Sequence, residues 1–140
     1  MYIPKGKSHT HKGKVYFGDT DAAGVVYYGN YLRFLEMGRI EYLQAMGYPY
    51  KSLRAEGIGL VPVHLDMNYH SPLKFEDNFT VSAAITRLSK ASLIMTQSIS
   101  CKSVLICSAT IKLACCDEVK FKAIKLPESL INTLIEFEKS

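Results

Sequence analysis

Two aspartates stand two residues apart in a short segment that also carries three glycines and three tyrosines. The segment runs from Phe17 to Tyr31 and reads Phe-Gly-Asp-Thr-Asp-Ala-Ala-Gly-Val-Val-Tyr-Tyr-Gly-Asn-Tyr. A carboxylate such as that of Asp21 can act on a carbonyl carbon as a nucleophile, or as a general base for water. A helix that starts here would add free backbone N–H groups, which can hold a developing negative charge. The segment is therefore a candidate site for carbonyl chemistry.

Each of these residues also has a purely structural explanation. Asp21 could accept backbone N–H groups near Gly24, as aspartates in turns do, and Asp19 is predicted to be a turn residue of this kind. Gly24 could allow a substrate to approach closely, or could simply occupy a position with positive φ. Tyr28 and Tyr31 could stack on a substrate ring or pack in the core. The spacing alone leaves these alternatives open.

The periodicity of the apolar residues predicts the elements that would position this segment. A short strand is expected over 14–17, and a largely buried helix over 31–46, with Asn30 as N-cap and Gly47 as C-cap. A second, short helix is expected over 50–56. Strands are then expected over 61–70, 79–88, 92–101 and 104–116. Residues 121–124 are either a last strand or a loop, and Pro127 opens a C-terminal helix that ends near residue 137.

This order of elements predicts an α+β fold. A long apolar helix followed by four antiparallel strands can bury the helix if a curved sheet wraps around it. Residues 1–12 are polar and basic and are expected to form a flexible segment, whereas residues 13–140 are expected to form a single domain. The other face of the sheet would then need cover or a partner.

The composition argues against several other classes of protein. The formal net charge is only +4, the basic residues are scattered, and no zinc-finger or RNP-type motif occurs, so no nucleic-acid partner is expected. No apolar run reaches the roughly 18 residues of a membrane span, and the first residues do not resemble a secretory signal. A cytoplasmic protein with no membrane partner is therefore expected. The four cysteines form no Cys-x-x-Cys pair and are predicted to lie in the core.

Two further clusters of polar residues have ordinary structural explanations. One face of the strand predicted over 61–70 carries His64, Asp66, Asn68 and His70. Such residues can bind a metal, but an alternating polar face is typical of any half-exposed strand, so no metal site is predicted. Glu36 and Arg39 are expected to form an ion pair, solvated or at an interface, on the predicted helix. The Gly-x-Ser-x-Gly motif of serine esterases of the α/β-hydrolase type is absent.

The stretch from Val15 to about Leu43 resembles the hot-dog-fold acyl-CoA thioesterases of the 4-hydroxybenzoyl-CoA thioesterase family. The resemblance is carried by the pattern Asp-x-Asp-x-x-Gly-x-Val-x-Tyr-x-x-Tyr, which starts at Asp19, and by the Tyr-Leu-Arg-Phe-Leu-Glu start of the helix. The order and spacing of the strands fit to about residue 126. The resemblance implies a hot-dog fold, in which a curved antiparallel sheet wraps around one long helix. It also implies hydrolysis of an acyl-CoA thioester to a free acid and CoA without a cofactor.

The resemblance assigns roles to particular residues. Asp21 corresponds to the family's catalytic carboxylate, as nucleophile or general base, and the backbone N–H of Tyr28 to the group that polarises the carbonyl. The pantetheine arm and the phosphates of CoA would lie across an interface between protomers. Their expected ligands lie on the turn after the strand predicted over 79–88 and are Arg87, Ser89 and Lys90.

Three more residues are expected to contact the substrate, namely Gly24, Tyr31 and His64. In such families two protomers pair into one continuous sheet and tetramers are common, so a homodimer or homotetramer is expected. One alternative is a hot-dog dehydratase or hydratase, which commonly uses a histidine near the helix, but residues 15–63 contain none. Another is a module that binds acyl-CoA or acyl-carrier thioesters without hydrolysis, for which the carboxylate of Asp21 would be unnecessary.

Overall fold

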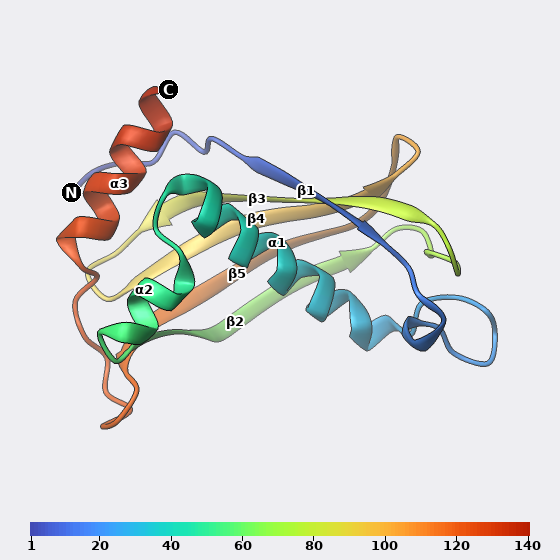
Figure 1. Ribbon diagram of the computed structural model, residues 1–140, viewed down its shortest axis with the longest axis horizontal. Helices are drawn as coiled ribbons and strands as arrows, with labels where there is room; N and C mark the ends of the chain where they lie inside the picture. Colours follow the sequence, from blue (N-terminus) through green and yellow to red (C-terminus); the bar gives the residue numbers. More distant parts are fainter.

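A five-stranded antiparallel sheet with one long helix across its face makes up the body of the molecule (Figure 1). The computed structural model describes all of residues 1–140. The strands lie in the order β1-β3-β4-β5-β2, and their bounds in that order are His9–Lys14, Asn78–Leu88, Ser92–Cys101, Val104–Asp117 and Ile58–Tyr69. Helix α1, Tyr31–Met46, packs on β1, β3 and β4. The predicted α+β architecture is confirmed.

Helix α1 has the bounds that its sequence predicts. Gly47 ends the helix in the left-handed conformation, with φ of 98°, as a C-cap glycine does. The predicted N-cap is wrong, because the side chain of Asn30 caps nothing. A 3-10 turn, η2 (Tyr28–Asn30), leads into α1, and the Asn30 side chain donates instead to the backbone oxygen of Asp19.

The first strand lies earlier in the chain than the sequence predicts. Strand β1 covers His9–Lys14 and pairs with β3, whereas the 3-10 turn η1 covers Phe17–Asp19. The prediction of a strand over 14–17 is therefore wrong, and residues 9–12, which the sequence assigned to a flexible segment, belong to the sheet. Backbone hydrogen bonds at an edge of the sheet hold this strand, so its side chains can be polar and give no apolar signal.

Two clusters of buried apolar side chains fill the space between α1 and the sheet. One contains Tyr42, and the other contains Phe34 and Phe79, whose ring centroids are 4.6 Å apart. Between them, α1 approaches β3 closely at Gly38. A Cβ atom at that position would lie 2.6 Å from a methyl group of Val81, so the glycine sets how near the helix lies to the sheet.

The face of the sheet away from α1 carries hydroxyl side chains. The Oγ atoms of Ser82 and Ser98 lie 2.8 Å apart, and the Oγ1 atoms of Thr86 and Thr96 lie 3.1 Å apart. Each pair joins β3 to β4 across this face. Because water can solvate such a surface, this part of the sheet does not need the cover that the sequence led us to expect.

Strand β2 is the outer strand at the other edge, and its apolar side chains are exposed. It pairs only with β5. Val61, Val63 and Leu65 are 44%, 57% and 39% exposed, although their strict alternation is typical of a strand with one buried face. A register shift between Pro62 and His64 interrupts the pairing with β5. One copy of the chain thus leaves an apolar strand edge uncovered.

Two shorter helices lie at the end of the sheet where both termini lie (Figure 1). Helix α2 covers Tyr50–Ala55 and helix α3 covers Glu128–Lys139, close to the predicted ranges. Residues 121–124 form no strand, and only an isolated bridge joins Ala123 to Cys116. This segment is therefore part of the loop that leads into α3.

Candidate functional site

The loop between β1 and α1 folds as a small hairpin at the other end of the sheet (Figure 1). An isolated bridge joins Thr20 to Val26, and the backbone N–H of Asp21 donates to the backbone oxygen of Val25 at 2.9 Å. The hairpin carries Asp21 outwards and returns the chain to Tyr28, where the helical segment begins. The two residues expected to do the chemistry thus lie on either side of one short hairpin.

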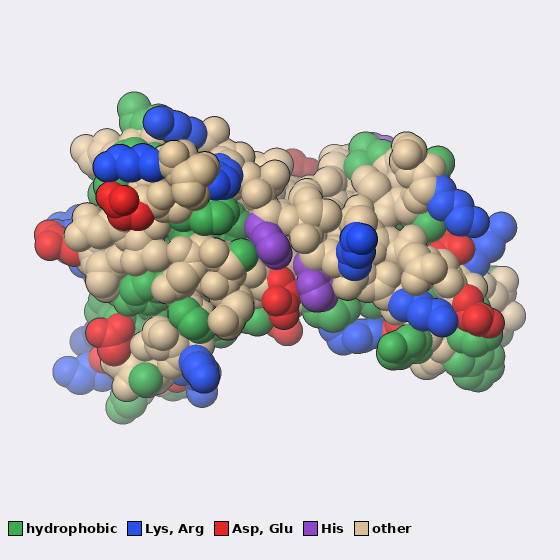
Figure 2. All heavy atoms as spheres, turned by 45° about the horizontal axis from the view of Figure 1, so that its top comes forward, with side chains coloured by type: hydrophobic (Ala, Val, Ile, Leu, Met, Phe, Trp, Pro, Cys, Tyr) green, Lys and Arg blue, Asp and Glu red, His purple; other side chains and the backbone are tan.

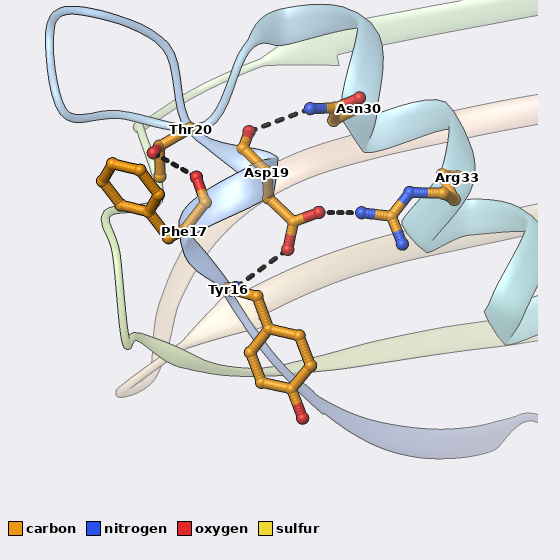
Figure 3. Close-up of polar contacts among 6 residues, drawn as sticks. All are labelled: Tyr16, Phe17, Asp19, Thr20, Asn30 and Arg33. Atoms are coloured by element: carbon orange, nitrogen blue, oxygen red, sulfur yellow. Dashed lines mark hydrogen bonds and ion pairs between the residues drawn. The ribbon is translucent and has the colours of Figure 1, made fainter.

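Asp19 is the buried centre of the hydrogen bonds that hold this loop (Figure 3). It is only 6% exposed. One carboxylate oxygen accepts the backbone N–H of Tyr16 at 2.9 Å, and the other pairs with the guanidinium group of Arg33 on α1. The backbone oxygen accepts the N–H of Tyr27 at 3.1 Å and the side-chain amide of Asn30 at 2.9 Å. Asp19 is a structural residue, as predicted, but its partners extend well beyond a turn.

Asp21 is exposed, and only one of its carboxylate oxygens is engaged. Its Oδ1 accepts the backbone N–H of Ala23 at 2.8 Å, which is the bond that a turn residue makes. The other oxygen, Oδ2, makes no hydrogen bond with the protein. The structural and the functional explanation are therefore compatible, because one oxygen holds the turn and the other is free for a reacting molecule.

The backbone N–H of Tyr28 stands at the start of the helical segment. The carbonyl oxygen of Tyr28 accepts the N–H of Tyr31 in the 3-10 turn, whereas the first N–H of such a turn has no partner within the turn. The dipole of α1 adds partial positive charge at this end. The hydroxyl of Tyr69 on β2 donates to the Tyr28 carbonyl at 3.2 Å, and this bond connects the start of the helical segment to the outer strand β2.

A shallow hollow of about 320 Å³ opens beside Tyr28. Its lining consists of residues from the loop, the start of α1 and the end of β2, namely Val26, Tyr28, Tyr31, Tyr69, His70, Ser71 and Pro72. Tyr31 is 3% exposed, its hydroxyl accepts the N–H of Leu73 at 3.0 Å, and burial raises its pKa. Tyr31 is thus a core residue that also lines the hollow, and its contact with a substrate stays a prediction.

Two other expected contact residues lie at different places. Gly24 has φ of 82°, and the space where a Cβ would lie is empty, so the turn conformation itself accounts for the glycine. His64 is exposed on β2, opposite Lys112 of β5. The histidine that lies beside the loop is instead His70, whose Nε2 is 3.0 Å from the Oγ of Ser108. The sequence placed both histidines on one strand face but could not indicate which one lies beside the loop.

The basic turn expected to bind CoA lies at the far end of the sheet from Asp21. The side chains of Arg87, Ser89 and Lys90 are exposed between β3 and β4. Strand β3 has 11 residues, which separates its ends by about 33 Å at about 3.3 Å per residue. A single copy of the chain therefore does not bring this turn to Asp21.

Two hollows of about 290 and 360 Å³ follow α1 on the side facing β2. Both are lined by Glu36, Arg39 and Pro62 among mainly apolar neighbours. The expected Glu36–Arg39 ion pair is not formed; instead a guanidinium N–H of Arg39 donates to Oε1 of Gln97 at 3.1 Å, and burial lowers the pKa of Arg39. Gln97 is itself buried and donates to the backbone oxygen of Leu35 at 2.8 Å. No sequence pattern indicates the role of Gln97, because a polar residue in a strand usually indicates exposure.

Three of the four cysteines are packing residues, as predicted, whereas Cys116 is only half-buried. None forms a disulfide, and Cys101, Cys107 and Cys115 are buried. Burial raises the pKa of the Cys107 and Cys115 thiols to about 11, which keeps them protonated and poorly nucleophilic at neutral pH. No three His, Cys, Asp or Glu side chains gather as a metal centre would require. None of the helices combines the length and apolar character needed to cross a bilayer.

The surface shown in Figure 2 has no large block of one charge. Lys and Arg side chains are dispersed over this face, with acidic side chains between them. A continuous basic surface of the kind that binds nucleic acid is not seen on this face.

The chain is similar to known thioesterases in sequence and in structure. The family model for the thioesterase-like superfamily matches residues 15–134. The acyl-CoA thioester hydrolase YbgC of Shigella flexneri is 33% identical over 119 residues, which are 84% of this chain and 89% of that protein. A probable thioesterase from Bartonella henselae has a TM-score of 0.82 at 32% identity, over 86% of this chain and 100% of that one. The 4-hydroxybenzoyl-CoA thioesterase from Pseudomonas sp. strain CBS-3 has a TM-score of 0.82 at 25% identity, over 90% and 98% of the two chains.

Proposed function

The chain belongs to the thioesterase-like superfamily and is an acyl-CoA thioesterase, and we propose that Asp21 and the backbone N–H of Tyr28 carry out its chemistry. The observation that supports these roles is the geometry of the loop. The hairpin presents a carboxylate with one free oxygen, and it leads directly into the start of the helical segment. A base or nucleophile and an oxyanion donor therefore stand on one short connection.

The reaction needs only these groups and water. As a general base, Asp21 takes a proton from a water molecule, whose oxygen attacks the carbonyl carbon of the thioester. The N–H of Tyr28 and the dipole of α1 hold the negative charge that develops on the carbonyl oxygen. Collapse of the tetrahedral intermediate breaks the C–S bond, and the CoA thiolate leaves with the bonding electrons. As a nucleophile, Asp21 instead forms a mixed anhydride with the acyl group, which water then hydrolyses.

The enzyme acts as a homodimer that pairs through the free edge of β2. Three exposed apolar side chains on that edge, Val61, Val63 and Leu65, support this assembly. Antiparallel pairing of two β2 strands would satisfy the open backbone groups and cover these side chains. A homotetramer would then be made of two such dimers.

Pairing of this kind would complete the site. A two-fold axis perpendicular to the sheet reverses the direction of the partner's strands, so the turn end of one copy lies at the loop end of the other. Arg87, Ser89 and Lys90 of one copy would then serve the loop that carries Asp21 of the other. Basic and hydroxyl side chains at this place suit the phosphates of CoA.

The acyl group occupies the hollows between α1 and β2, which continue from the helix start along the dimer edge. Their mainly apolar lining, which includes Leu32 and Leu65, suits an acyl chain or an aromatic ring. Gly24, Tyr31 and His64 remain the expected contacts around the reacting end of the substrate. The location in the cytoplasm likewise remains a prediction from the sequence.

Release of thiol from a panel of acyl-CoA esters tests the proposal. Asp21→Asn removes the charge at nearly constant shape, and we expect kcat to fall by about 100-fold or more. The matched control is Asp117→Asn, because Asp117 accepts the backbone N–H of Val119 at 2.8 Å in a turn away from the loop. The control should keep the rate of the unmodified enzyme. Equal rates for the enzyme and Asp21→Asn would contradict the role of Asp21, and binding of the esters without thiol release would favour a binding module.

A further inference from the structure

We propose that Asp19 and Arg33 are positioning residues, which hold the hairpin and the helix start in the one arrangement that lets Asp21 and Tyr28 act on the same carbonyl. The inference rests on the proposed function of those two residues. Asp19 acts here without touching the substrate, and the charge of Arg33 pairs with Asp19 within the protein. Figure 3 shows how the two side chains meet between the loop and α1.

The contacts of Asp19 join three segments of the chain around the loop. Its carboxylate takes the N–H of Tyr16 before the hairpin and the guanidinium of Arg33 in the first turn of α1. Its backbone oxygen takes the N–H of Tyr27, the residue directly before Tyr28. Asp21 follows Asp19 by only two residues. The distance between the catalytic carboxylate and the oxyanion donor is therefore set through Asp19.

The charge of Asp19 is the feature that a plain turn does not explain. A neutral side chain could accept the N–H of Tyr16, whereas burying a carboxylate costs free energy unless it is paired. What the charge adds is the bond to Arg33, which links the loop to the helix. The side chain of Arg33 is 53% exposed, so burial does not fix it in place. Asp19 and Arg33 thus hold each other, and together they hold α1 against the loop.

The two arms of the hairpin beyond Asp19 are fixed differently. The returning arm is bonded to the segment before β3, because the N–H of Val26 donates to the backbone oxygen of Leu73 at 2.8 Å and an isolated bridge joins Val25 to Lys74. Residues 21–24 are exposed, and the turn is held by its own backbone bonds and by the Ala23 N–H to Asp21. The arm that carries Asp21 can therefore shift if it is loosened at Asp19. Because a misplacement of about 1 Å between reacting groups can cost about 100-fold in rate, the loss of the anchor should appear in kcat.

The test compares Asp19→Asn, Arg33→Gln and the double variant in steady-state thiol release. We expect each single variant to lower kcat by about tenfold with KM changed by less than about twofold, because the ion pair sets the arrangement of the reacting groups and does not bind the CoA phosphates. The double variant should be no worse than the singles, since both remove the same ion pair. Arg33→Lys should recover part of the loss. The matched control is Arg54→Gln, which breaks the 3.0 Å pair with Glu118 and should leave kcat unchanged.

A purely structural role gives a different pattern. In that case the variants would lower the melting temperature and the folded fraction, while kcat per folded molecule, counted by circular dichroism, would stay as in the unmodified enzyme. That result, or additive losses in the double variant, would overturn the inference. If Asp19→Asn does not fold, the two Arg33 variants test the inference. The Arg33 side chain is half exposed, so its replacement should leave the protein folded. Unchanged activity of Asp21→Asn would instead overturn the proposed function, and the inference with it.

Discussion

Each end of the sheet is held together by one buried carboxylate, and the two carboxylates differ in how far along the chain their partners lie. At the loop end, Asp19 binds residues that are 3 and 14 positions away, Tyr16 and Arg33. At the end with the termini, Glu138 of α3 accepts the hydroxyl of Tyr2 at 2.6 Å and the N–H of Lys5 at 2.9 Å, 136 and 133 positions away. The first network is local and surrounds the proposed chemistry. The second joins the two ends of the chain.

The two ends of one protomer therefore carry different groups of residues. The loop end carries Asp21 and the helix start, whereas the terminal end carries the strap of residues 1–7 and the basic turn with Arg87 and Lys90. The strap and the turn lie together, because residues 1–4 and 86–88 line one hollow. Both ends contribute to one site only if two copies of the chain are paired through antiparallel β2 strands.

The largest effect should come from breaking that pairing. Val63→Asp places a charge in the proposed β2–β2 contact, where burial without a partner is costly. We expect a monomer by light scattering and a fall in kcat/KM of about 100-fold, because the loop with Asp21 then lacks the basic turn of a second copy. Val104→Asp, at a valine that is 50% exposed on β5, is the control and should remain a fully active dimer. An active monomeric Val63→Asp would refute a site shared between copies.

A smaller effect should follow from changes at the terminal end alone. Replacing Arg87 and Lys90 together by Glu removes the charges that suit the CoA phosphates. We expect KM for acyl-CoA to rise by about tenfold with kcat nearly unchanged, and the difference to shrink at high salt. The same double change at Lys120 and Lys122, in a loop with no proposed role, should leave KM unaltered. A fall in kcat without a change in KM would place this turn nearer to the chemistry than proposed.

The smallest effect on activity should come from Glu138, whose role is to hold the strap. Burial raises the pKa of Glu138, but hydrogen bonds from Tyr2 and from the backbone N–H groups of Lys5 and Lys7 outweigh it and leave the pKa below the ordinary 4.5. We expect Glu138→Gln to lower the free energy of unfolding by about 1–2 kcal/mol at pH 7, without loss of activity.

The difference in stability between the enzyme and Glu138→Gln should depend on pH in a defined direction. A carboxyl group with a lowered pKa contributes stability above its unfolded value and loses it as the pH falls through the folded value. Urea unfolding should therefore show the full difference above about pH 5 and little of it in stronger acid. Glu136→Gln, which breaks only an exposed 3.2 Å pair with Lys139, is the control. A difference that persists undiminished in acid would contradict a role for the charge.

The sequence predicted the elements whose side chains face a core. Helix α1 was predicted with its correct bounds because its apolar face repeats at the helical period and Gly47 marks its end. Strand β1 was misplaced because an edge strand held by backbone bonds needs no apolar pattern. The exposure of β2 was missed for the opposite reason: its alternation is typical of a buried face, whereas its apolar side chains are exposed in the single chain.

The candidate residues of the loop are easier to predict than the contacts that support the loop. Asp21 and Tyr28 belong to a recognisable pattern of residues, and the structure places one on the hairpin and the other at the start of the helical segment that follows it. The bond between Asp19 and Arg33 crosses that hairpin, so no period relates the two residues. Gln97 lies 58 residues from Arg39, which it supports, and Glu138 is further still from the strap. Contacts of this kind depend on tertiary packing, which spacing along the chain does not specify.

A heterodimer of two defective copies tests most directly whether one site is built from both ends of the sheet. One copy carries Asp21→Asn and the other carries Glu at positions 87 and 90, and two different tags allow the mixed dimer to be purified. One of its two sites then joins an intact loop to an intact turn. We predict about half the activity of the unmodified dimer at low acyl-CoA concentration. A mixed dimer no more active than its two parents would contradict the shared site.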